Sequence, residues 1–163
     1  MTVAGTALTA VGKLAIDSYA NYEQLAGGVE TLFGDSAKTV QKYADAAYKT
    51  AGLSANEYLD TVMSFSSRLL QGLGGDTAKA AEISDTAVVD MADNVNKLGG
   101  SMESLQNAYQ GFAKQNYDML DNLKLGYGGT QAEMARLIND SGVLGDSFTV
   151  TADTVNNVPF DKI

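Results

Sequence analysis

The sequence predicts an all-α fold, a bundle of about six antiparallel amphipathic helices followed by an irregular or short β-like C-terminal tail. Three observations lead to this prediction. Apolar residues recur with steps of three and four over long segments, polar residues that can cap a helix precede these segments, and glycines separate most of them. The chain has 163 residues, 45% of them hydrophobic, so it is long enough to bury one sizeable core.

The first predicted helix covers residues 6–33 and is expected to extend from the bundle. Its apolar stripe has heptad spacing and consists of Leu8, Val11, Ala15, Ser18, Tyr22, Leu25, Val29 and Leu32. Gly27 and Gly28 lie inside this helix. Because each glycine costs about 1 kcal/mol relative to alanine in a helix interior, we expect a kink or a break at this point.

Helix-start signals place the remaining helices at residues 35–51, 54–73, 76–98, 101–125 and 130–140. Each start has a side chain that can accept a hydrogen bond from a free backbone amide: Asp35, Ser54, Asp76, Ser101 and Thr130. Ser54 and Thr130 are followed three residues later by glutamate, which predicts two reciprocal capping boxes. Glycine before most of these caps is typical of a helix end, since glycine adopts the left-handed conformation without steric cost.

Two glycine clusters predict hinges between helices. They are Gly72, Gly74 and Gly75, and Gly126, Gly128 and Gly129. Neither cluster has a Gly-Lys-Ser/Thr ending or follows an apolar strand, so a turn between helices is favoured over a phosphate-binding loop. We expect positive φ angles at Gly128 and Gly129, with Tyr127 packed over the turn.

The predicted 101–125 helix has the clearest apolar stripe. Its members are Met102, Leu105, Tyr109, Phe112, Asn116, Met119 and Leu123. The stripe has two interpretations, as part of the core of this domain or as a packing seam that assembles with other copies. A lone asparagine in such a seam fixes register and oligomeric state in coiled coils. If Asn116 lies in a seam, Asn116→Leu is expected to raise stability or change the oligomeric state.

The character of the sequence changes after Ser141. Residues 143–151 contain alternating β-branched residues without a helical stripe, which predicts a short hairpin or an extended tail. We therefore divide the chain into a helical core module, residues 1–142, and an irregular tail, residues 143–163. The last residues carry no cap or stop signal, so the chain is expected to be a piece of a longer parent.

The composition removes the usual parts of most enzymes. There is no cysteine and no histidine, so thiol nucleophiles, thiolate metal sites and imidazole bases are excluded. Carboxylates one helical turn apart are typical of a solvated helix flank, and none has the spacing of an EF-hand loop. These pairs are Asp118 with Asp121, Asp90 with Asp93, and Glu57 with Asp60. The sequence predicts no catalysis, no cofactor and no metal site.

Charge and hydropathy argue against two classes of partner. The net charge is −9, whereas direct nucleic-acid binding depends on clustered lysine and arginine. Every apolar run is interrupted well before the roughly 20 residues that a bilayer span requires. We therefore expect neither direct nucleic-acid binding nor a stable membrane span.

Residues 90–138 resemble the helical core of tail tape measure proteins of long-tailed bacteriophages and of prophages derived from them, of the type found in Gram-positive hosts. The resemblance is carried by the stretches Asp90–Asn94, Gln106–Gln115, Asn116–Gly129 and Gln131–Ile138. A looser similarity extends over residues 23–140, through the stretches Leu53–Tyr58 and Leu69–Gly75. From Val143 onward the chain departs from the family pattern.

The resemblance implies a structural role. Tape measure proteins are long, mostly helical chains in the lumen of the growing phage tail, and their length sets the length of the tail. The implied partners are the tail tube protein, tail assembly chaperones and other copies of the chain. The implied location is the virion tail lumen, and the host cytoplasm during assembly. Without the resemblance, the residues predict an acidic helical interaction protein, either free-standing or lying on a membrane surface.

Overall fold

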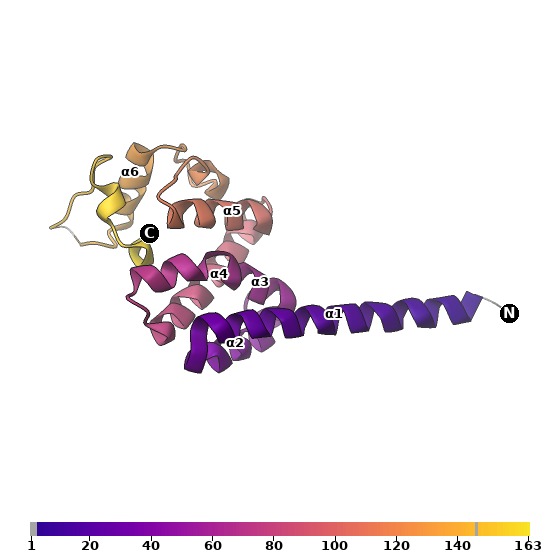
Figure 1. Cartoon of the computed structure of the whole chain (residues 1–163). Coiled ribbons are helices and arrows are strands. Elements are labelled where there is room, and N and C mark those ends of the chain that lie inside the picture. Colours follow the sequence, from indigo (N-terminus) through magenta and orange to yellow (C-terminus); the bar gives the residue numbers. More distant parts are fainter. Residues whose placement is uncertain (1–2, 146) are drawn as a thin grey trace.

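The computed structural model describes residues 3–145 and 147–163, and all regular structure in this part of the chain is helical (Figure 1). The predicted all-α class is confirmed. The α-helices are α1 Val3–Phe33, α2 Ala37–Thr50, α3 Ala55–Gly72, α4 Thr77–Leu98, α5 Met102–Ala113 and α6 Gln131–Ser141. The short 3-10 helices are η1 Gly34–Ser36, η2 Leu120–Leu123, η3 Val155–Asn157 and η4 Phe160–Lys162.

Most of the predicted caps are formed. The side chains of Ser54, Asp76, Ser101 and Thr130 accept a hydrogen bond from a backbone amide in the first turn of their helices. At Ser54 the capping box is reciprocal, because the Glu57 carboxylate also accepts from the backbone amide of Ser54 at 2.8 Å. These caps fix where α3, α4, α5 and α6 begin.

The predicted cap at Asp35 is wrong. Asp35 lies inside η1, and α2 begins after Ser36, whose side chain makes no capping hydrogen bond. Phe33 and Ser36 adopt right-handed helical conformations and Gly34 has a positive φ of 52°, so the chain enters α2 through a 3-10 turn and not through an extended capping residue. The Ser36 hydroxyl instead lies 2.9 Å from that of Thr77, which ties this corner to the start of α4.

α1 is a continuous helix through its two glycines. It has 31 residues, which corresponds to a length of about 46 Å. The expected break at Gly27 and Gly28 does not occur. A Cβ atom on Gly28 would lie 2.7 Å from the terminal methyl of Met63 on α3, so this glycine lets the two helices approach closely. Gly27 faces open space.

We expect Gly27→Ala to stabilise the protein by about 0.5 to 1 kcal/mol, because alanine is favoured over glycine in a helix interior and nothing obstructs its methyl group. Gly28→Ala is the matched control. Its methyl group must displace the end of Met63, so we expect a smaller gain or none. Urea denaturation of both variants measures the difference, and equal gains would contradict the close approach at Gly28.

Two clusters of buried apolar residues form the core. The first core cluster consists of Val29, Phe33, Ala37, Val40, Ala44, Ala47, Tyr58, Leu59, Val62, Phe65, Leu69, Ala80, Ala81, Val88, Met91 and Leu105. The second core cluster consists of Ala108, Phe112, Tyr117, Leu120, Met134, Ala135, Ile138, Val150 and Val155. The helices α1 to α5 pack against one another around the first cluster, and α6 belongs to the second.

Polar bonds between helices accompany the first cluster. The hydroxyl of Tyr58 on α3 donates to the Asp85 carboxylate on α4 at 2.8 Å. The amide of Gln106 on α5 donates to the Thr61 hydroxyl on α3 at 2.6 Å. Because buried polar groups are costly when unpaired, these bonds help to specify which faces of α3, α4 and α5 meet.

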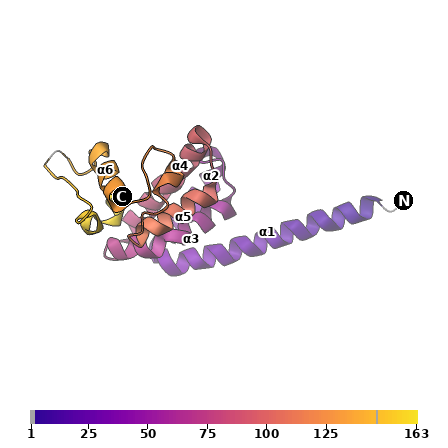
Figure 2. The same ribbon diagram turned by 90° about the horizontal axis from the view of Figure 1, so that it is seen from above.

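The N-terminal part of α1 projects away from the rest of the molecule (Figures 1 and 2). Side chains are described from Gly12 onward, so those of Leu8 and Val11 in the predicted stripe lie outside the described residues. Residues 12–21 are all exposed, and the Asn56 amide at the start of α3 donates to the carbonyl of Ser18. Toward the other end of the helix, Val29 and Phe33 are fully buried.

The C-terminal segment contains no strand in its described residues, so the predicted short β-like tail is wrong. Asp146, within the predicted pattern, lies outside the described residues. The side-chain amide of Asn139 on α6 both accepts from the backbone amide of Val150 and donates to its carbonyl, each at 2.8 Å. A side chain therefore provides the backbone hydrogen bonds that a neighbouring strand would otherwise provide.

Candidate functional site

The predicted packing seam does not form one helical stripe. α5 ends at Ala113, so the predicted helix over residues 101–125 is wrong beyond that point. Four members lie on α5, where Leu105 and Phe112 are buried and Met102 and Tyr109 are half-buried. Asn116 is exposed in the following turn, Met119 is 47% exposed, and Leu123 belongs to η2.

α5 stops because its C-terminus closes in a tight backbone motif. The amide of Asn116 donates to the carbonyl of Gly111, and the amide of Gln115 donates to that of Phe112. Gln115 adopts a positive φ of 61°. This pattern is a Schellman motif with glutamine in the left-handed position where glycine is usual. A Cβ on Gly111 would lie 2.9 Å from the Asn116 carbonyl oxygen. The lack of a side chain at Gly111 therefore lets the chain fold back against the end of α5.

Asn116 therefore has a local role in this structure. Its side-chain oxygen accepts from the backbone amide of Asp118 at 2.9 Å, which stabilises the turn after α5. The expected gain in stability from Asn116→Leu assumed a position in an apolar seam. In this turn the leucine would remove a hydrogen bond and add an exposed apolar group.

A row of aromatic rings links the two core clusters along α5. The ring centroids of Phe65 and Tyr109 are 6.3 Å apart, those of Tyr109 and Phe112 are 5.8 Å apart, and those of Phe112 and Tyr117 are 6.0 Å apart. Burial raises the pKa of Tyr109 to about 12, with a further contribution from Asp90. The row belongs to the packed interior, where such aromatic pairs contribute to stability.

The predicted hinge glycines play different parts. Gly74 and Gly75 have φ angles of 63° and 86°, and they end α3 through a bond from the amide of Gly75 to the carbonyl of Leu70. Gly72 is the last residue of α3. Gly126 also has a positive φ, 84°. The turn at residues 72–75 thus has the backbone geometry expected of a glycine-rich helix end.

The expected positive φ angles at Gly128 and Gly129 are not found. Gly129 is required for another reason, because a Cβ on it would lie 2.2 Å from the carbonyl oxygen of Asp118. The backbone of the segment before α6 therefore lies directly against the backbone of the turn after α5. At Gly128 a Cβ would make an ordinary contact of 3.8 Å with Glu133.

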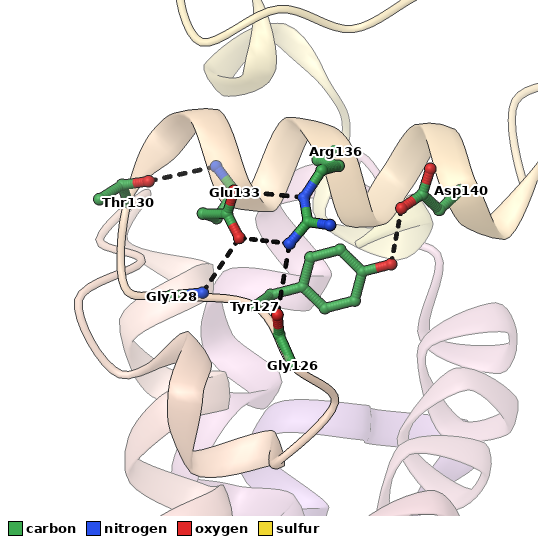
Figure 3. A network of polar contacts seen from close by, with 7 residues as sticks. All are labelled: Gly126, Tyr127, Gly128, Thr130, Glu133, Arg136 and Asp140. Atoms are coloured by element: carbon green, nitrogen blue, oxygen red, sulfur yellow. Dashed lines mark hydrogen bonds and ion pairs between the residues drawn. The ribbon is translucent and has the colours of Figure 1, made fainter.

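A polar network on α6 holds the segment that precedes this helix (Figure 3). Arg136 donates to the Glu133 carboxylate at 2.6 Å and to the carbonyl of Gly126 at 3.3 Å. Its guanidinium also lies 4.3 Å from the centre of the Tyr127 ring. The Glu133 carboxylate accepts from the amide of Gly128.

This network corrects the expected capping box at Thr130 and shows which contacts hold Tyr127. Glu133 bonds Gly128 and Arg136, so the predicted reciprocal capping box at Thr130 is only half formed. Tyr127 stacks on Arg136, and its hydroxyl donates to the Asp140 carboxylate at 2.8 Å. The ion pair between Glu133 and Arg136 could have been predicted from the sequence, because residues three apart are neighbours on a helix.

The electrostatics of the network follow from these bonds. Hydrogen bonds from Arg136 and Gly128 lower the pKa of Glu133, and the Glu133 carboxylate raises the pKa of Arg136. The bond to Asp140 raises the pKa of Tyr127. Every shift favours the protonation states that make the contacts. The network is thus suited to fixing the segment that precedes α6.

The predicted carboxylate pairs lie on helix flanks and turns. Burial raises the pKa of Asp90, and nearby Asp93 adds to this effect. Among residues 3–145 and 147–163, acidic side chains do not gather in groups of three or more that could hold a metal ion. No helix of this described part is long and apolar enough to cross a membrane.

The residues described in this subsection position and pack segments of the chain. The sequence predicted roles for the apolar residues of α5 and for the hinge glycines. It did not predict that Gly111 is needed for the turn at the end of α5, or that Arg136 is the centre of a polar network. Comparisons with protein-family models, with curated protein sequences and with solved structures find no match to this chain.

Proposed function

We propose that this chain is a module of a bacteriophage tail tape measure protein, built as a bundle of antiparallel helices. It acts as a scaffold in tail tube assembly and contributes to tail length determination, without catalysis. Its partners are the tail tube protein, tail assembly chaperones and other copies of the chain. Its location is the tail lumen, and the host cytoplasm during assembly. The sequence resemblance over residues 90–138 supports this proposal, since those residues form the C-terminal part of α4, then α5, the turn after it with η2, and most of α6.

The projecting part of α1 is the single observation that carries the proposal. Leu14, Ile16 and Tyr19 are 68%, 71% and 64% exposed, although they are large apolar or aromatic residues. An isolated helix as short as this projecting part, about 15 residues, is marginal in water, because most helical stability comes from packing. A rod-like helix that presents apolar side chains is suited to joining the module to other helices in a long assembly.

Charge favours a second copy of the chain as the neighbour of this helix. The whole chain has a net charge of −9, whereas the ten residues 12–21 contain one lysine, Lys13, and one acid, Asp17. Two copies can therefore approach along α1 without the like-charge repulsion that the rest of the surface would impose. The single basic residue also fits poorly with a membrane-surface helix, which usually places several lysines or arginines beside its apolar face.

We expect the chain to self-associate through α1 and the double variant Ile16→Gln with Tyr19→Gln to shift it toward the monomer. Glutamine keeps a good helix propensity and removes the apolar contact. Phe148→Gln is the matched control, because Phe148 is also an aromatic residue that is 71% exposed, but it lies in the segment between α6 and η3. Sedimentation equilibrium over a range of concentrations measures the mass. A wild-type chain that stays at 17.1 kDa throughout would contradict association through α1.

An immunoblot of the source culture tests the function itself. Antibody against this chain is applied to purified phage-like particles and to cleared lysate after induction. We expect a band much heavier than 17.1 kDa that co-purifies with tails. A band at 17.1 kDa found only in the soluble lysate would contradict the proposal and favour a free-standing helical interaction protein.

A further inference from the structure

The C-terminal residues Val158–Ile163 cross from α6 and its surroundings to the helices of the first core cluster. Within the described part of the chain, the extensive contacts of α6 are with η3, not with α1 to α4. Figure 1 shows the C-terminus lying between α6 and α4. We call residues Val158–Ile163 the strap, since this segment runs from the second core cluster onto α3.

A few contacts hold the strap. Phe160 is half-buried and packs against both core clusters, and η4 contacts α3. The ammonium group of Lys79 on α4 lies 3.3 Å from the Asp161 carboxylate, whose side chain is only 8% exposed. Lys79 is half-exposed, so solvent partly screens this ion pair and it contributes less than the buried apolar contact, but the largely buried Asp161 carboxylate still needs Lys79 as its partner. The ring of Phe160 is therefore the main anchor.

The packing around the strap is incomplete. A partly open cavity of about 160 Å³ lies beside Phe160 and Ile163 and reaches Phe65, Leu69 and Phe112. A second hollow of about 340 Å³ lies along residues 156–160, with Arg68 and Gln115 on its wall. Both hollows open to solvent, so the strap atoms beside them contact water where a core segment would contact close-packed side chains. The strap therefore gains less from its position than a well-packed core segment would.

We propose that Val158–Ile163 is a detachable strap, which lifts from α3 and α4 while both core clusters stay folded. When the strap is closed, it covers one side of an apolar groove formed by Phe65, Leu69 and Phe112. Opening exposes this groove. The bond from Gln106 to Thr61 and the bond from Asn94 to the carbonyl of Leu123 keep α5 and η2 on the helical body during this motion. The strap thus controls access to a surface inside the fold. This motion is independent of the function proposed above.

Two single-cysteine variants test the strap, because the chain has no cysteine of its own. Leu69→Cys places a thiol in the wall of the cavity, where Leu69 is buried. Leu59→Cys is the matched control, since Leu59 is also buried on α3 but does not line this cavity. The rate of labelling by a small thiol reagent under native conditions reports how often each site opens.

Phe160→Ala is then combined with each cysteine variant. We expect labelling at position 69 to become about tenfold faster or more, because the anchor of the strap is removed. Labelling at position 59 is expected to stay within about twofold. Equal acceleration at both positions would mean global destabilisation, and no acceleration at position 69 would mean that the strap does not gate the groove. Either result overturns the proposal.

Lys79→Gln provides an independent variant that leaves the apolar anchor in place. It removes the ion pair to Asp161 and is expected to accelerate labelling at position 69 by a smaller factor than Phe160→Ala does, with no change at position 59. High salt should reduce the difference in the labelling rate at position 69 between the variants with and without Lys79→Gln, because salt screens an exposed ion pair. If Phe160→Ala fails to fold by circular dichroism, this variant decides the question, and unchanged labelling at position 69 overturns the proposal.

Discussion

Replacing Gly129 with alanine is expected to destabilise the protein by about 3 kcal/mol or more. The added Cβ would lie 2.2 Å from the carbonyl oxygen of Asp118 and 2.8 Å from its carbonyl carbon. These are backbone atoms, so relief requires the segment before α6 to separate from the turn after α5. For a chain of this size, the loss corresponds to a fall in Tm on the order of 10 °C. Thermal unfolding followed by circular dichroism measures it.

Gly128→Ala is the control for this prediction. The two glycines are adjacent and neither has a positive φ, but a Cβ on Gly128 would meet its nearest neighbour, the Glu133 side chain, only at 3.8 Å. The amide that donates to the Glu133 carboxylate is retained. We expect a change within about 0.5 kcal/mol. Similar Tm values for the two variants would mean that the backbone contact between Gly129 and Asp118 is not formed.

Truncating Phe33 is the second prediction with a large expected effect. Phe33 is fully buried where α1 ends, and it belongs to the first core cluster with residues of α2, α3 and α4. Phe33→Ala removes a large side chain from a site that cannot fully collapse. We expect a loss of about 3 to 5 kcal/mol, measured by urea denaturation.

Tyr48→Ala is the matched control, since it also removes an aromatic ring but from a side chain that is 79% exposed on α2. We expect a change within about 0.5 kcal/mol. If Phe33→Ala were no more destabilising than Tyr48→Ala, α1 would not be anchored to the body through its last turn.

The helix starts could be predicted because capping is local. The hydroxyl of Ser54 and the carboxylate of Asp76 each bond an amide three residues away, so the residues that decide the start are adjacent in the sequence. The end of α5 could not be found in this way. The apolar spacing continues beyond Ala113, and glutamine at position 115 occupies the left-handed position without the glycine that normally signals it.

The remaining errors concern contacts between segments that are distant in the sequence. Whether Gly129 is needed depends on the position of Asp118, and the hydrogen bonds of Val150 depend on Asn139. Likewise, Phe160 gives no helical or strand signal, yet it bridges both core clusters. Periodicity and capping rules describe one element at a time, so these tertiary contacts lay beyond them.

The projecting part of α1 also affects how the chain diffuses. A compact chain of 163 residues has a radius of gyration of about 15 Å. The helix from Val3 to Asp17 adds a rod of about 22 Å to one side of such a body. Its friction exceeds that of a sphere of equal mass, so a monomer elutes early in gel filtration, at the volume of a larger globular protein. Elution volume would therefore suggest an oligomer even where none exists, and only a measurement of mass that is independent of shape can count the copies.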